Sequence, residues 1–137
     1  MEVNGKVVVE RTSPSALKVR VDLKVSGEDV GIKRTKDINV VHTVTSKSDV
    51  LWIAKYIIEK VTTYRVDIDE FWVRVGGYGV VGRNGLPKVD GCAISAKDLV
   101  KIVKDMIVKM FREYADLIKW IKEDKAEEEF NYIVEVK

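Results

Sequence analysis

Residues 95–124 read SAKDLVKIVKDMIVKMFREYADLIKWIKED, and this stretch contains neither glycine nor proline. Its apolar residues recur at steps of three and four, which is the spacing of one face of an α-helix. These positions are Leu99, Ile102, Val103, Met106, Ile107, Met110, Phe111, Tyr114, Ile118 and Ile121. Ser95 and Asp98 have the spacing of a capping box, so we expect the helix to begin there. A helix over the whole stretch would be roughly 45 Å long, and a sheet or a second copy must cover its apolar stripe.

The rest of the chain predicts strands before and after a shorter helix. Alternating or β-branched runs indicate strands at 6–10, 17–25, 38–45, 64–75, 78–81, 89–94 and 132–136. Residues 26–37 are polar and predict a loop or irregular hairpin tip, whereas Ser46 and Asp49 predict the start of a helix that ends near 62. We therefore expect an α+β fold, with a mainly antiparallel sheet and one medium and one long C-terminal helix packed on one face. The expected order is β-β-β-α-β-β-β-α-β.

Length and composition set the class of protein. The chain has 137 residues with 46% hydrophobic content, which suits a single globular domain over 1–137. It has no apolar run of about 18 residues and its N-terminus lacks a signal-peptide pattern, so we expect a cytoplasmic protein without membrane spans. Glutamine is absent and charged residues are abundant, a pattern typical of thermophiles, here archaeal or viral. The net charge of +2 does not by itself indicate nucleic acid.

Few residues could support catalysis or bind a metal. Cys92 is the single cysteine, which excludes an intramolecular disulfide, and we expect it to pack in an apolar environment. His42 shares a predicted strand face with Ile38, Val40 and Val44, and is either a general base, a metal ligand or a locally bonded histidine. Asp67 and Asp69 occupy alternate strand positions and could bind Mg²⁺ or Mn²⁺, although such pairs commonly mark a solvent face.

Glycines concentrate between residues 76 and 91. Their spacing matches neither the P-loop nor the dinucleotide fingerprint, so hairpin turns explain most of them. A contact loop that carries Arg83 and Lys88 is the functional alternative.

The most distinctive predicted surface is basic. It consists of Lys18, Arg20 and Lys24 on one strand face, followed by Lys33, Arg34 and Lys36. Such a set could follow a phosphate backbone, although nearby acids dilute its charge and no aromatic residue in this segment could stack on bases. A solvated thermophile surface is the alternative.

Val108, Leu117 and Trp120 widen the apolar face of the predicted long helix beyond what one sheet covers. Large apolar groups outside the core stripe indicate a partner surface, and a two-fold homodimer is the commonest form. A sheet that curls around the helix would also cover these residues.

These features favour a non-enzymatic binding protein, homodimeric through its long helix and without a cofactor. The first alternative is a nucleic-acid-binding protein that uses the basic set together with Arg83 and Lys88. The second is a metal-dependent enzyme that acts on phosphates through Asp67, Asp69 and His42.

Overall fold

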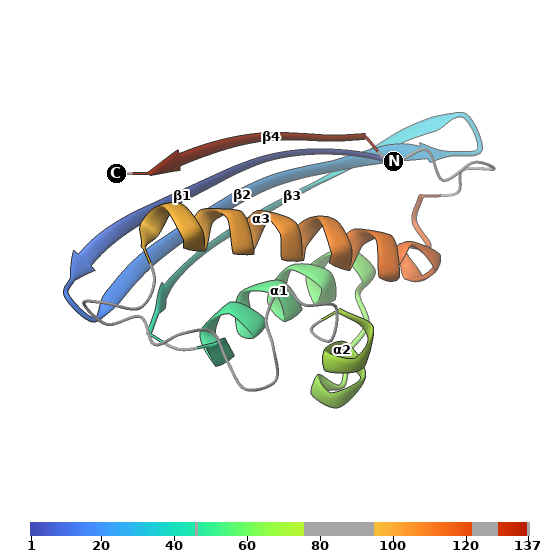
Figure 1. Ribbon diagram of the computed structural model, residues 1–137. Helices are drawn as coiled ribbons and strands as arrows, with labels where there is room; N and C mark the ends of the chain where they lie inside the picture. The colour runs from blue at the N-terminus through green and yellow to red at the C-terminus, as the bar shows by residue number, and fades with distance from the viewer. Residues whose placement is uncertain (46, 76–94, 122–128, 137) are drawn as a thin grey trace.

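In the computed structural model, which describes all residues except 46, 76–94, 122–128 and 137, four strands form one sheet (Figure 1). They are β1 (Glu2–Ser13), β2 (Ala16–Asp29), β3 (Ile32–Val44) and β4 (Glu129–Val136). Their order across the sheet is β3-β2-β1-β4. Strand β2 is antiparallel to both of its neighbours, β1 and β3, whereas β4 runs parallel to β1. The predicted α+β class is confirmed.

Alternation along β2 explains why this sheet has one covered face. The odd residues from Leu17 to Val25 are buried, whereas Lys18, Arg20 and Lys24 are exposed. Because successive strand residues point to opposite faces, this pattern directs the apolar row to the core and the basic row to solvent. We call the face opposite the helices the outer face.

The β2–β3 hairpin is longer and more regular than the sequence predicts. Residues 26–37, expected to form a loop, instead continue both strands and pair in unbroken register. The reversal needs only Val30 and Gly31, whose φ angles of 53° and 75° are both positive. Two consecutive positive φ angles are typical of the tight turn that suits the twist of paired strands.

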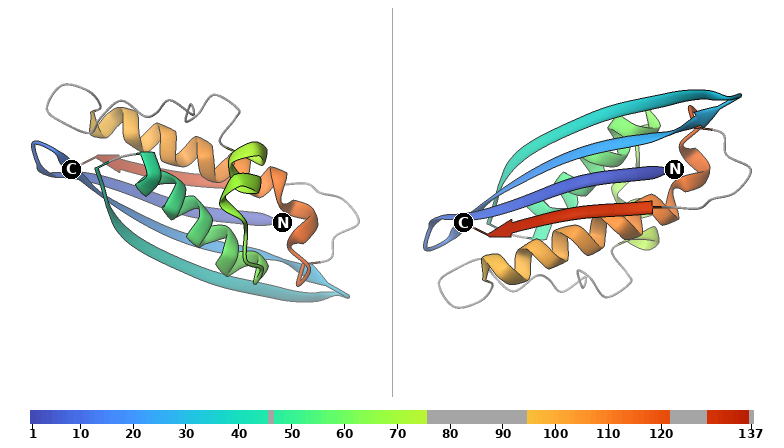
Figure 2. Two further views of the ribbon diagram at one scale, coloured as in Figure 1. Left: turned by 90° about the horizontal axis from the view of Figure 1, so that it is seen from below. Right: turned by 90° about the horizontal axis from the view of Figure 1, so that it is seen from above.

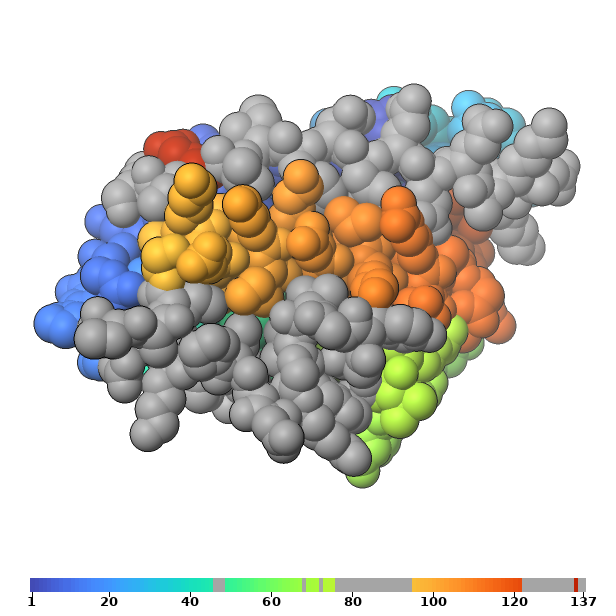
Figure 3. All heavy atoms as spheres, viewed as in Figure 1, coloured from blue at the N-terminus to red at the C-terminus, as the bar shows by residue number. Residues whose placement is uncertain are grey.

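The helices cover the other face of the sheet (Figure 2). They are α1 (Lys47–Thr62), α2 (Ile68–Arg74), α3 (Ala96–Glu113) and the short 3₁₀ helix η2 (Ala115–Leu117). Helix α1 packs against β3, and α3 packs against β1, β4 and α1. In the space-filling view of one face, α3 runs along the surface and α2 lies near its C-terminal end (Figure 3).

The prediction of an extended segment over 64–75 is wrong, because its second half forms α2. The Asp67 side chain caps this helix by accepting hydrogen bonds from the backbone N–H groups of Asp69 at 2.9 Å and Glu70 at 3.1 Å. Phe71 is fully buried and its ring stacks on that of Tyr114 with centroids 6.1 Å apart. Local capping and burial therefore outweigh the strand propensity of this segment.

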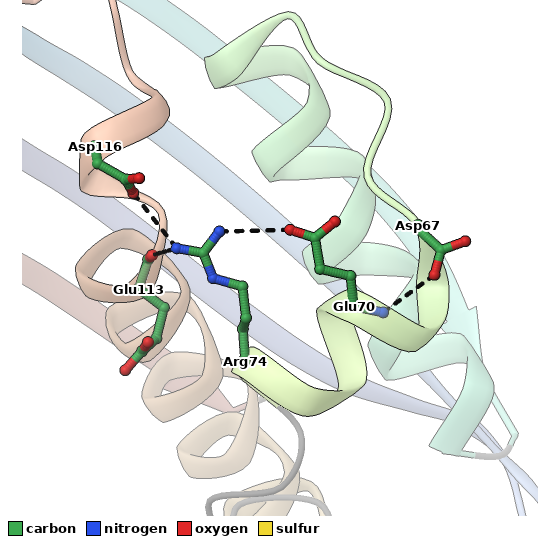
Figure 4. A network of polar contacts seen from close by, with 5 residues as sticks. All are labelled: Asp67, Glu70, Arg74, Glu113 and Asp116. Carbon is green, nitrogen blue, oxygen red and sulfur yellow. Dashed lines mark hydrogen bonds and ion pairs between the residues drawn. The ribbon is translucent and has the colours of Figure 1, made fainter.

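The long helix begins at its predicted cap but ends early. The Ser95 hydroxyl accepts a hydrogen bond from the Asp98 N–H at 3.1 Å. Helix α3 then stops after 18 residues at Glu113, about 27 Å from its start. At this end Arg74 donates to the Glu113 carbonyl oxygen. Its guanidinium also lies 3.4 Å from an Asp116 carboxylate oxygen and 3.6 Å from a Glu70 oxygen (Figure 4). Arg74 of α2 thus binds a carbonyl that the end of α3 leaves without a partner in the helix.

The strands predicted at 78–81 and 89–94 lie outside the described residues, as does the end of the predicted long helix at 122–124. The final strand is present, and it begins at Glu129, before the predicted start at 132.

Candidate ligand-binding surface on helix α1

Helix α1 carries a row of rings and cations on the side away from the core. Trp52, Tyr56 and Lys60 follow each other at steps of four residues, and Tyr64 continues the row beyond the end of the helix. Residues four apart lie on the same helical face. Trp52 is 45% exposed and Tyr64 is 47% exposed. Large aromatic surface is therefore accessible to a ligand here.

The strand β3 extends this row by one ring. His42 stacks on Trp52 with centroids 4.3 Å apart and an interplanar angle of 20°. Trp52 in turn stacks on Tyr56 at 5.3 Å, also with an angle of 20°. The three rings form a ladder that begins at the edge of the sheet and follows α1.

The row lines a hollow of about 350 Å³. Its lining residues are Trp52, Lys55, Tyr56, Glu59, Lys60, Thr63, Tyr64 and Arg65. Three of them are basic and one is acidic, and the acid Glu59 is held by Lys55 at 2.5 Å. The ammonium of Lys60 lies 5.3 Å from the Tyr56 ring centroid, and that of Lys119 lies 5.9 Å from the Tyr64 ring. The hollow thus combines ring faces with a surplus of positive charge. We call these eight residues together with His42 the α1 surface.

Local hydrogen bonds hold both ends of the α1 surface. The Asp49 carboxylate lies 3.0 Å from His42 Nε2 and also accepts from the N–H of Thr45 at 2.9 Å and its hydroxyl at 3.1 Å. At the other end, Thr63 has a φ of 63° and its N–H donates to the Glu59 carbonyl at 3.0 Å. Thr63 directly follows α1, and a residue with positive φ that bonds a carbonyl of the last turn is a common way for a helix to end.

His42 lies on the helix-side face of β3, with buried Ile38, Val40 and Val44, as its alternation predicts. Its polar partner is Asp49, and its ring contributes to the ladder. Within the described parts of the chain, no group of three or more His, Cys, Asp or Glu residues could hold a metal ion.

The two aspartates considered as metal ligands do not share a strand face. Asp67 caps α2 and Asp69 is an exposed residue of its first turn. Acidic residues at this position interact favourably with the helix dipole. Capping of α2 and the interaction with its dipole therefore explain why positions 67 and 69 carry aspartate.

The six basic residues expected on one surface are divided between the two faces of the sheet. Lys18, Arg20 and Lys24 lie on the outer face of β2, and the register of β3 places Lys33 on the same side. Acidic residues lie beside these cations on the outer face. In the strand pairing, Glu10 is opposite Lys18 and Asp37 is opposite Lys24. The Asp22 carboxylate lies 3.1 Å from Arg20 Nε. The outer face therefore carries mixed charge.

Arg34 and Lys36 lie on the helix side. Arg34 lies 3.7 Å from Asp29, and Lys36 donates to the Lys60 carbonyl at 2.6 Å. A cation at the last carbonyls of a helix stabilises its C-terminus. Arg83, Lys88 and Cys92 lie outside the described residues.

Trp120 of the expected dimer surface is engaged within the chain. Its indole N–H donates to the Val61 carbonyl at 2.6 Å, and Lys36 lies 5.8 Å from its ring. Leu117 also packs against the core, whereas Val108 is half-buried.

No protein-family model, curated protein or solved structure matches the chain. None of the helices among the described residues is long and apolar enough to cross a membrane.

The α1 surface was not predicted from sequence, because no aromatic residue lies beside the basic strand and the rings of α1 are far from it along the chain. The signal was present as the i, i+4 row Trp52, Tyr56, Lys60 and Tyr64, which lies opposite the buried stripe of the same helix. The stacking of His42 on this row required the fold.

Proposed function

We propose that this protein is a non-enzymatic binding protein that binds single-stranded nucleic acid on the α1 surface. The observation that carries the proposal is the stacked ladder of His42, Trp52 and Tyr56, continued by Lys55, Lys60 and Arg65 around one hollow. Rings and cations side by side are the two components that single-strand binders combine.

Stacking favours a single strand over a duplex. An unpaired base can place its face on an exposed ring, whereas the bases of a duplex already stack on one another. Tyr64 is 47% exposed at the far end of the row, and Trp52 is 45% exposed although its ring already stacks on those of His42 and Tyr56. Each base–aromatic contact of this kind contributes about 1–3 kcal/mol.

The cations supply the contact to phosphates. Lys60 and Arg65 line the hollow, and no ion pair with an acid is found for either among the described residues. Neutralising phosphates releases counterions, so affinity should fall as salt rises, with a logarithmic slope of about 0.7 per phosphate for single strands.

Fluorescence anisotropy with labelled RNA and DNA oligonucleotides, single- and double-stranded, over a salt series tests the proposal. We expect single strands to bind and Trp52→Ala to weaken their binding about tenfold, because the aromatic ladder loses its central ring. Lys60→Glu should weaken binding and reduce the salt slope.

The matched control is Lys18→Glu with Arg20→Glu, which reverses charge on the outer face and leaves the α1 surface intact. It should bind as the unmodified protein does. Loss of binding in this control, with Lys60→Glu unaffected, would assign the ligand to the basic face of β2. The proposal would be wrong if no oligonucleotide bound at low salt.

We propose two further properties, namely a thermophilic source and a homodimer. The absence of glutamine and the high charge density support a thermophilic source, archaeal or viral. A homodimer through α3, supported by half-buried Val108, is the alternative to a dimer that forms through the edge of the sheet. In that case Val108→Glu, and not a variant at the sheet edge, should halve the mass measured by light scattering.

A further inference from the structure

The strand β3 lies at one edge of the sheet, in the order β3-β2-β1-β4. Its 13 residues pair with β2, and no other described strand pairs with it. An edge strand leaves a row of backbone N–H and C=O groups on its free side, which can pair with another chain. Natural sheets protect such edges with bulges, prolines or charged side chains.

Only the first half of β3 has this protection. Lys33, Arg34, Lys36 and Asp37 crowd its N-terminal half. The second half, Ile38–Val44, reads INVVHTV and contains no proline and no Lys, Arg, Asp or Glu. Its pairing with β2 shows no bulge, and Val41 is 54% exposed on the outer face. This segment, which we call the β3 edge segment, has the composition of a strand that is normally paired.

We propose that the β3 edge segment pairs antiparallel with the same segment of a second copy, centred on Val41. In that register Val41 lies opposite its own copy, and Asn39 lies opposite Thr43 on the outer face. On the helix side, Ile38 lies opposite Val44, and both are core residues in one chain. Val40 lies opposite His42 on the same side, so apolar residues meet only in part: Val41 meets Val41 and Ile38 meets Val44, whereas Val40 meets the His42 ring. The sheet continues from one copy into the other in this register.

The charges of β3 disfavour registers centred on its N-terminal half. Pairing centred on Asp37 would set two carboxylates opposite each other, and pairing centred on Lys36 would set two ammonium groups opposite. Like charges in directly opposed positions are destabilising. The segment that pairs with itself without such conflict is therefore the uncharged one, and its two-fold arrangement closes the assembly at two copies.

Light scattering over a concentration series, without nucleic acid, tests the pairing separately from ligand binding. We expect twice the 15.6 kDa of one chain at high concentration. Val41→Lys should give the mass of one chain, since it sets two cations opposite each other at the two-fold axis. Val73→Lys is the matched control, because Val73 is 71% exposed on α2, remote from the edge, and it should remain dimeric.

Mixing Val41→Lys with Val41→Glu provides a positive test, because opposite charges at the axis should restore the dimer. Circular dichroism checks that each variant is folded. The inference is overturned if the unmodified protein stays monomeric, if Val41→Lys stays dimeric, or if Val73→Lys also becomes monomeric.

Discussion

Val30 and Thr63 are the non-glycine residues of the described chain that adopt positive φ, at 53° and 63°. Branched side chains are strained in this region, at a cost of about 1–2 kcal/mol. Val30 is 88% exposed, so little packing offsets the strain at the hairpin turn. Thr63, by contrast, shapes the hollow of the α1 surface.

Replacing Val30 with Asn should therefore stabilise the protein. Asn tolerates positive φ and precedes Gly in the favoured two-residue hairpin turn, so we expect a gain of about 1 kcal/mol. Gly31→Ala should act in the opposite direction, because φ is 75° there although a Cβ would meet no atom within 4 Å. Urea unfolding measures both. A loss of stability in Val30→Asn would contradict the claim that the positive φ of Val30 strains the turn.

Tyr114 predicts a dependence of stability on pH. Its side chain is fully buried, and its hydroxyl finds no hydrogen-bond partner among the described residues. Burial, with the charge of Glu70 next, raises its pKa from 10.0 to about 12. The unfolded chain then loses this proton first as pH rises, so stability should fall between about pH 10 and pH 12, by roughly 2–3 kcal/mol.

Tyr114→Phe removes this titration and an unsatisfied hydroxyl. Its stability at pH 7 should be equal or slightly higher, and its loss between pH 10 and pH 12 should be smaller than that of the unmodified protein. Urea unfolding at several pH values provides the comparison. Parallel pH profiles would show that Tyr114 does not titrate as its burial requires.

At the scale of elements, Arg74 joins α2 to the end of α3. Besides its bond to the Glu113 carbonyl, its guanidinium lies 4.2 Å from the Tyr114 ring centroid. Arg74→Ala should cost about 1–3 kcal/mol, because it removes a charged hydrogen bond at a helix terminus. Arg20→Ala is the control. That arginine pairs with Asp22 on the exposed outer face, so its loss should cost less than about 1 kcal/mol. Equal costs would contradict a special role for Arg74.

The elements that the sequence predicted well are those with a local signal. The alternation from Leu17 to Val25 and the Ser95 cap depend on neighbouring residues, and both are present. The carbonyl at the end of α3 is bound by Arg74, 39 residues earlier, and this contact could not be predicted from the composition of the helix. Helix α2 had a readable signal, since Asp67 and Glu70 have capping-box spacing, but the aromatic and β-branched residues around them suggested a strand.

At the scale of the whole molecule, the fold decides which basic residues share a surface, and these are not the ones that the sequence groups together. Lys18 and Lys36 lie on opposite faces of the sheet. Lys18 is on the outer face of β2, whereas Lys36 of β3 points to the helix side and donates to the Lys60 carbonyl. Lys60 and His42 have the same separation in sequence as Lys18 and Lys36, and the packing of α1 on β3 brings both to the α1 surface. The basic residues could be identified from sequence, whereas their grouping required the fold.

The most direct test of the α1 surface is a titration of ¹⁵N-labelled protein with a short single-stranded oligonucleotide, followed by NMR. We predict that the amide signals of Trp52, Tyr56 and Lys60 shift progressively, while those of Lys18, Arg20 and Lys24 on the outer face stay in place. Shifts confined to the outer face, or no shifts at low salt, would contradict the account.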